Sequence, residues 1–234
     1  MVRGYEQRVH LPYQFRHNTT IATILEALTM IQIIPELVTF AQFIDWYPEK
    51  SEHRYELHNG EIVEMPKATG KHSKVAGFTA LKVGIEIERL NLPYFIPKEC
   101  VIKPMREESG YEPDIIVLNE QTIGNEPRWE KSSIITMGSS APLIVAVTST
   151  NWGDDYALKL EAYESMGIQE YWIIDYLGLG GRRFIGNPKQ PTFSVYQLID
   201  GEYQVKLFRG GEGIESPTFP ELKLTAQQVF AKGN

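Results

Sequence analysis

The sequence predicts a mixed α/β fold, of the α/β or α+β class. Two apolar runs of strand length, residues 113–118 and 142–149, precede a helical pattern over about 154–166. Gly167 provides the expected left-handed end of that helix, and a further strand is predicted at 169–176. Strands that occur before, between and after helices are typical of this class and argue against a helical bundle.

The bulk properties are those of a globular domain. The chain has 234 residues, of which 42% are hydrophobic and 23% are charged. Its formal net charge of −7 argues against a dedicated nucleic-acid binder but leaves open a nuclease with local basic residues. A single cysteine, Cys100, excludes an internal disulfide and a cysteine-cluster metal site. Because we find no secretory signal and no membrane span, we expect a cytoplasmic protein.

The chain is predicted to contain an N-terminal extension over 1–38, with a short helix at about 21–31, and a single domain over 39–234. Thr39 is expected to cap a second short helix that begins at Phe40.

Two hairpins are predicted in the domain. Residues 54–65 alternate about Asn59-Gly60, a dipeptide suited to a type I′ turn, and residues 192–210 alternate about Asp200-Gly201.

A long helix is predicted between the hairpins, at about 71–90. A strand over 94–105 should follow it, whereas residues 119–141 are too irregular to assign, and Thr225 should cap a short helix near the end. The apolar stripe expected on the long helix consists of Val75, Phe78, Leu81, Ile85 and Leu90.

Asp114 is the first candidate for metal binding. A residue before proline favours extended backbone, so Glu112-Pro113-Asp114 is predicted to open a strand. A carboxylate at the end of a strand can bind a hard divalent cation, which prefers oxygen ligands. From this short motif alone, a solvated acid at the end of a strand remains an alternative.

Lys159 is the second candidate, four residues after Asp155 on the predicted helix. This spacing is typical of a surface ion pair, whereas a lysine beside a metal can orient the attacking water or stabilise charge on a phosphate. His72 stands at a predicted helix start, where a capping or surface role competes with catalysis. Glu56 and Glu61 lie on either side of a hairpin turn, where acids are most often solvated.

The chain resembles one known family over about residues 39–230, the Uma two family of proposed restriction endonucleases, which is abundant in cyanobacteria. The resemblance implies a PD-(D/E)XK nuclease core, in which a mixed sheet is flanked by helices, and cleavage of phosphodiesters with Mg²⁺. The segments that carry it, in the family's order and spacing, are YELHNGEIVEM, His72, EPDIIVL, PLIVAVTST and DDYALKLEAYESMGIQEYWIID.

The resemblance also implies roles for individual residues. Asp114 corresponds to the metal-binding aspartate, and Lys159 resembles the catalytic lysine, moved from the strand onto the following helix. Glu61 resembles an upstream acid and metal ligand, and His72 a frequent histidine. The acids would hold Mg²⁺, or Mn²⁺ in its place, and the metal would activate a water that Lys159 helps to position. DNA is the implied substrate.

Ala146 departs from the family pattern, because the family usually has a second acid there. A methyl group cannot bind a cation, so the metal would depend on Asp114 and Glu61. Two functions follow: an endonuclease whose Mg²⁺-dependent DNA cleavage is impaired, or an inactive nuclease-fold module that binds nucleic acid or a protein partner. A homodimer is a further expectation, formed through the extension 1–38 or the hairpin 192–210.

Overall fold

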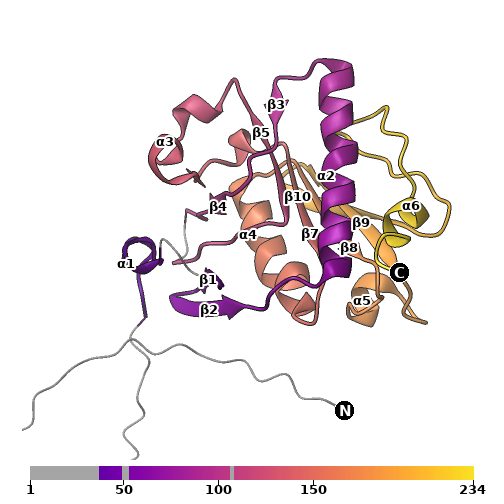
Figure 1. Ribbon diagram of the computed structural model, residues 1–234, viewed down its shortest axis with the longest axis horizontal. Helices are drawn as coiled ribbons and strands as arrows, with labels where there is room; N and C mark the ends of the chain where they lie inside the picture. Colours follow the sequence, from indigo (N-terminus) through magenta and orange to yellow (C-terminus); the bar gives the residue numbers. More distant parts are fainter. Residues whose placement is uncertain (1–36, 49–52, 106–107) are drawn as a thin grey trace, which may run out of the picture.

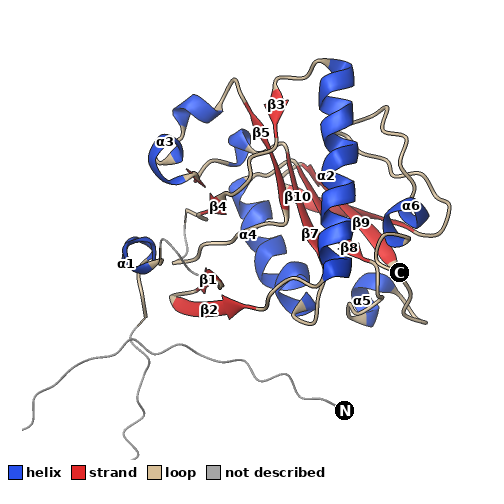
Figure 2. Ribbon diagram, viewed as in Figure 1, coloured by secondary structure: helices blue, strands red, loops and turns tan. Residues whose placement is uncertain are grey.

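The computed structural model describes residues 37–48, 53–105 and 108–234. Its centre is a six-stranded mixed sheet with the strand order β10-β9-β8-β7-β5-β3 (Figure 1). Strands β7 (Leu143–Val147) and β8 (Glu170–Asp175) are parallel, and the other neighbours are antiparallel. Figure 2 shows helices beside this sheet, so the predicted mixed α/β class is confirmed. The remaining strands of the sheet are β3 (Tyr94–Phe95), β5 (Ile115–Asn119), β9 (Thr192–Ile199) and β10 (Glu202–Phe208).

Both predicted hairpins are confirmed. Strands β1 (Arg54–His58) and β2 (Glu61–Met65) pair about Asn59-Gly60, and β9 pairs with β10 about Asp200-Gly201. All four turn residues have positive φ, between 50° and 87°. A type I′ turn requires this left-handed backbone at both central positions, which explains why Asn-Gly and Asp-Gly predict it.

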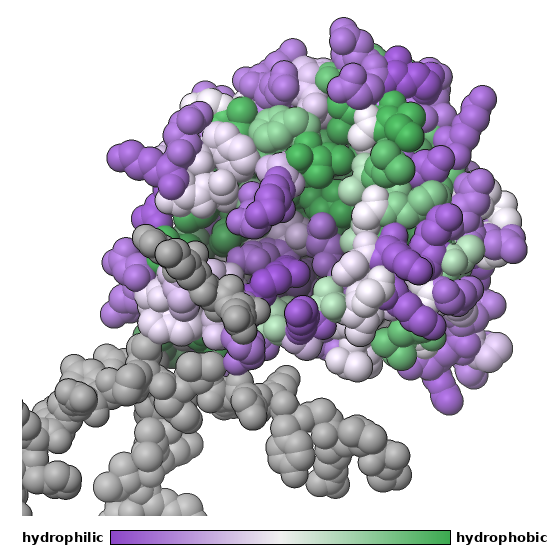
Figure 3. Space-filling view, viewed as in Figure 1, coloured by the Kyte–Doolittle hydropathy of each residue, from purple (hydrophilic) through white to green (hydrophobic). Residues whose placement is uncertain are grey.

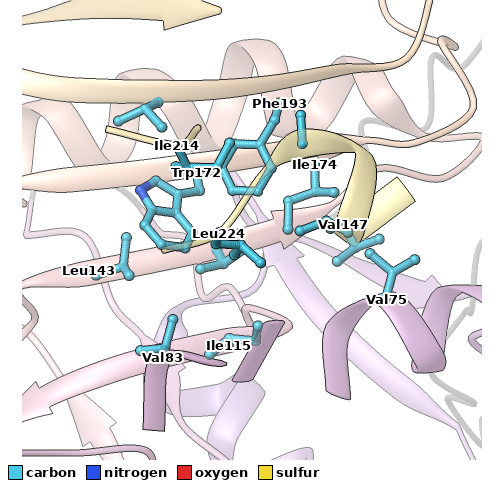
Figure 4. Close-up of a cluster of buried hydrophobic side chains, with 14 of the residues drawn as sticks. Val75, Val83, Ile115, Leu143, Val147, Trp172, Ile174, Phe193, Ile214 and Leu224 are labelled. Atoms are coloured by element: carbon cyan, nitrogen blue, oxygen red, sulfur yellow. The ribbon is translucent and has the colours of Figure 1, made fainter. Parts of the chain in front are cut away.

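Helices cover both faces of the sheet. Alternate strand residues such as Val145 and Val147 pack with α2 (Gly70–Leu90) and α6 (Ala226–Phe230) in one core cluster, part of which is drawn in Figure 4. The intervening strand residues pack on the other face. Their partners are a π-helical turn (Asp154–Leu158), α4 (Lys159–Met166), which ends at the left-handed Gly167 as predicted, and α5 (Arg182–Ile185).

The apolar stripe predicted for α2 is wrong in part. Leu81 is 60% exposed and Ile85 is 48% exposed. Thr79 can be buried in their stead because its hydroxyl donates to the Val75 carbonyl at 2.9 Å, which satisfies the polar group. The buried residues of α2 are Val75, Thr79, Val83, Glu86 and Ile87.

The single strand predicted over 94–105 is also wrong. Its ends form β3 and β4 (Val101–Ile102), which belong to different sheets, and Pro97 lies between them. A proline cannot donate to a strand ladder, which accounts for the break. Strand β4 instead pairs in parallel with β6 (Ile134–Ile135).

The irregular stretch 119–141 is held together by one buried carboxylate. Glu126 accepts hydrogen bonds from the backbone of Thr136 at 2.8 Å and Met137 at 2.9 Å. Besides β6, the segment contains a short helix α3 (Trp129–Ser132) and two 3₁₀ turns at Ile123–Asn125 and Gly138–Ser140.

Helix α1 (Phe40–Trp46) begins with the predicted cap, because the Thr39 hydroxyl accepts from the Gln42 amide. Its Phe40 and Phe43 pack against Leu57 of the first hairpin in a separate small cluster. The helix predicted at 21–31 lies outside the described residues. Within the described ranges, no helix combines the length and apolar character that a membrane span needs.

Candidate active site

A pocket of about 430 Å³ opens between the β1-β2 hairpin, the start of α2 and the start of α4. It lies at the end of the sheet where Asp114 precedes β5 and Val147 ends β7. Basic and acidic side chains line it side by side. The lining residues include Ala146 and the charged or titratable side chains of Arg54, Glu56, His72, Asp114, Asp155 and Lys159.

Asp114 and His72, which are 42 positions apart in the sequence, meet at the end of β7. The Asp114 Oδ2 atom accepts from the Val147 amide at 2.7 Å. His72 Nε2 donates to the Val147 carbonyl at 2.8 Å and lies 3.5 Å from Asp114 Oδ2. Burial alone would lower the pKa of His72, but its contacts with Asp114 and the Val147 carbonyl raise it above the usual value.

Lys159 is buried beside two carboxylates. Its Nζ atom lies 3.0 Å from Glu56 Oε1 and 3.5 Å from Asp155 Oδ1. Lys159 and Asp155 are each 5% exposed, so they are not a solvated surface pair, which was the alternative the spacing left open. Burial would lower the pKa of Lys159, but Glu56 and Asp155 outweigh it, and the ammonium form is strongly favoured.

Glu56 connects three parts of the site. Its Oε1 atom accepts from Lys159 and from the Glu112 amide at 3.0 Å, and its Oε2 atom lies 2.8 Å from His58 Nε2. The side chain is fully buried. Burial by itself would raise the pKa of Glu56, but Lys159 and His58 lower it to about 2. Glu56 therefore carries a charge at neutral pH and fixes both Lys159 and the backbone that leads to Asp114.

No local pattern marks Glu56 as a buried residue of the site. In the alternation of β1 it lies opposite to Tyr55 and Leu57, which would place it toward solvent. Its partner Lys159 is 103 residues further along the chain. The pairing of Glu56 with Lys159 therefore follows from the folded structure and not from the local sequence around either residue.

Glu61 lies at the start of β2, opposite His58 in the hairpin register. It is half-buried and is not among the residues that line the pocket. The structure thus brings Asp114, His72 and Lys159 to one pocket and places Glu56 there from the hairpin, while the role of Glu61 as a metal ligand stays a prediction.

Ala146 lines the same pocket and stands beside Asp114. Ile115 pairs with Val145 in the antiparallel ladder, so the next step along that ladder sets Asp114 opposite Ala146. The side chain of Ala146 packs on the face that carries Tyr163 and Ile144. A carboxylate at this position would therefore extend into the pocket next to Asp114, where this chain presents a methyl group.

The side chains at the pocket do not fit a divalent cation as they stand. Both oxygens of Glu56 are engaged by His58 and Lys159, and burial raises the pKa of Asp155 to about 7 despite the nearby lysine. Within residues 37–48, 53–105 and 108–234, no group of three or more His, Cys, Asp or Glu side chains is arranged to hold a metal ion. Asp114 alone offers too few anionic ligands.

The six-stranded mixed sheet with helices beside it matches a nuclease-like fold. A crystal structure of "a putative nuclease belonging to DUF820" from Anabaena variabilis has a similar fold, with a TM-score of 0.63 and 18% sequence identity. The match covers 84% of this chain and 99% of the other. No curated protein sequence matches the chain.

Residues 40–227 match the family Uma2, described as "Putative restriction endonuclease". The chain belongs to this family. Restriction-endonuclease-like families generally use divalent metal ions. The pocket of this chain fits such an ion poorly, so any proposed function has to explain this difference.

Proposed function

We propose that this protein is a DNA endonuclease of the Uma2 family whose Mg²⁺-dependent cleavage of phosphodiester bonds is impaired. The observation that carries the proposal is Ala146, which lines the pocket opposite Asp114 where a second acid would complete a pair of carboxylates. A pair of neighbouring carboxylates is a common way to bind Mg²⁺ beside a substrate phosphate. Without the second acid, cation affinity and the rate of hydrolysis fall together.

The other pocket residues suit a polyanionic substrate. Lys67 and Lys71, near the start of α2, and Arg54 of β1 line the pocket. Positive side chains that line a pocket attract phosphates, even though the net charge of the whole chain is −7. Lys159 also lines the pocket, where its ammonium group is held by Glu56 and Asp155.

The decisive experiment compares this chain with Ala146→Glu, using Ala146→Gln as an uncharged control of the same shape. We expect Mg²⁺ and Mn²⁺ to bind the glutamate variant in calorimetric titrations and that variant to nick plasmid DNA. The parent chain and the glutamine variant should do both far more weakly. If the folded glutamate variant neither binds metal nor cleaves, the proposal of an impaired nuclease is wrong.

A second function is favoured by the internal charge balance of the site. Because Lys159 already neutralises Glu56, the pocket needs no metal ion to be stable. Such a pocket suits a catalytically inactive nuclease-fold module that binds nucleic acid or a protein partner. Salt-dependent binding of DNA without cleavage, by both the parent chain and Ala146→Glu, supports the DNA-binding form of this module. If neither protein binds any nucleic acid, a protein partner is indicated.

A further inference from the structure

Helix α2 exposes an apolar face that its own fold does not use. Leu81 and Ile85 are among the large hydrophobic side chains most exposed in the described part of the chain. Figure 3 shows hydrophobic side chains gathered over the region of the surface that α2 crosses. The opposite face of the helix already fills the core, so packing within the chain does not account for these two residues.

Two glycines lie on the same exposed face, at Gly77 and Gly84. A Cβ atom added at either position would meet no other atom within 4 Å. Glycine inside a helix is destabilising relative to alanine because it loses more backbone freedom on folding. Because no atom lies near these added Cβ positions, the fold of the chain itself does not require glycine at Gly77 or Gly84. Their benefit would come from a second helix, which can approach closely where there is no side chain.

The face is complementary to itself when reversed. Lys74 lies seven positions before Leu81, and Glu88 lies seven positions after it; both side chains are exposed. Gly77 lies four before Leu81, and Ile85 four after. If two copies of α2 cross antiparallel at Leu81, Lys74 faces the partner's Glu88. Gly77 then faces the partner's Ile85, so a small residue accommodates a large one.

We propose that this chain forms a two-fold symmetric dimer through antiparallel pairing of α2 with α2 of a second copy, centred on Leu81. A symmetric interface uses the same surface on both copies and must be complementary to itself. The α2 face meets this condition in size and in charge. An unrelated partner would not require the pattern to be symmetric about one residue. The proposal is independent of whether the pocket cleaves DNA.

The test is sedimentation velocity of the full chain from sub-micromolar to tens of micromolar. The parent chain should be a dimer at the upper end. Leu81→Glu should raise the dissociation constant about tenfold or more, because it places two carboxylates at the centre of the interface. Glu88→Lys should raise it about tenfold, since two like-charge pairs replace two opposite-charge pairs. The double variant Lys74→Glu/Glu88→Lys should restore the parent affinity.

Val205→Glu is the matched control, because Val205 is an exposed apolar residue on β10 of the hairpin that was the other candidate for dimerisation. It should leave the dimer unchanged. Circular dichroism and thermal melts verify that each variant is folded. A parent chain that stays monomeric at tens of micromolar, a dimer that survives Leu81→Glu, or a folded double variant that does not recover would each overturn the proposal.

Discussion

Glu56 and Lys159 form a buried ion pair with Oε1 and Nζ 3.0 Å apart, and this contact joins the first hairpin to helix α4. The same carboxylate oxygen accepts the Glu112 amide two residues before Asp114. The pair therefore sets the position of the candidate acid as well as that of the candidate lysine. Its loss should affect stability and the pocket together.

Replacing Lys159 by methionine should lower the free energy of unfolding by about 3–5 kcal/mol, because Glu56 would remain buried without a cation. The double variant Glu56→Gln/Lys159→Met should lose clearly less, since a neutral amide can still accept the Glu112 amide. Urea denaturation of the four proteins in this cycle measures the coupling.

Lys206→Met serves as the control for this cycle, because Lys206 pairs with Glu215 on the exposed surface. It should change the free energy of unfolding by less than about 1 kcal/mol. Equal losses for Lys159→Met and Lys206→Met would show that the buried pair contributes no more than a surface pair.

Asp155 should make stability depend on pH near neutrality. Its pKa in the fold is about 7, above the value of about 4 in an unfolded chain. A raised pKa stabilises the fold below pH 4, and this contribution disappears as the pH rises through 7. Between pH 5 and pH 8, the parent chain should therefore lose about 2–3 kcal/mol relative to Asp155→Asn.

The measurement is denaturant unfolding of both proteins at several pH values. Stability curves that stay parallel from pH 5 to pH 8 would mean that Asp155 titrates normally in the fold. The comparison between variants is needed because the other titratable groups contribute equally to both curves.

Gly138 should not tolerate a side chain. A Cβ atom there would lie 2.2 Å from the Met166 carbonyl oxygen, which belongs to the last turn of α4. Gly138→Ala should therefore cost about 1–3 kcal/mol, as one of the two backbones has to move. Gly124→Ala is the control, since nothing lies within 4 Å of its added Cβ atom. Thermal unfolding of the two variants should separate clearly, and equal melting temperatures would contradict the close approach.

Glu126 should be needed for order in residues 119–141. Removing its carboxylate in Glu126→Ala leaves the amides of Thr136 and Met137 without their acceptor. We expect a loss of about 2–3 kcal/mol and faster hydrogen exchange at these two amides. Glu130→Ala, which changes an exposed acid in the same segment, should leave exchange unchanged. Continued protection of both amides in Glu126→Ala would assign the order of the segment to other contacts.

Much of the fold could be predicted because it depends on local chemistry. Asn59-Gly60 and Asp200-Gly201 define their hairpins through the left-handed backbone that such turns require. Thr39 and Thr225 cap their helices by accepting nearby amides. The apolar runs before and after α4 became the parallel central strands, because strands that are covered on both faces consist mostly of apolar residues.

Local patterns failed where the sequence is compatible with more than one choice of buried residues. Helix α2 has apolar residues on more than one side, and only contact with the sheet decided that Thr79 and Val83 are buried while Leu81 is exposed. In residues 119–141 no periodic pattern exists, because Glu126 determines the path through side-chain hydrogen bonds.

By itself, the sequence determined the hairpin turns, the helix caps and the central strands, because each depends on its near neighbours in the chain. Asp114, Lys159 and His72 became candidates through the resemblance of their segments to a known family. The tertiary structure decided that Glu56 is the carboxylate that neutralises Lys159, and that Ala146 stands opposite Asp114 in the pocket. The physical reason is desolvation. A buried charge needs a partner of opposite charge close to it in space. That partner can lie far away in the sequence, as Lys159 does from Glu56, so no periodic pattern predicts it.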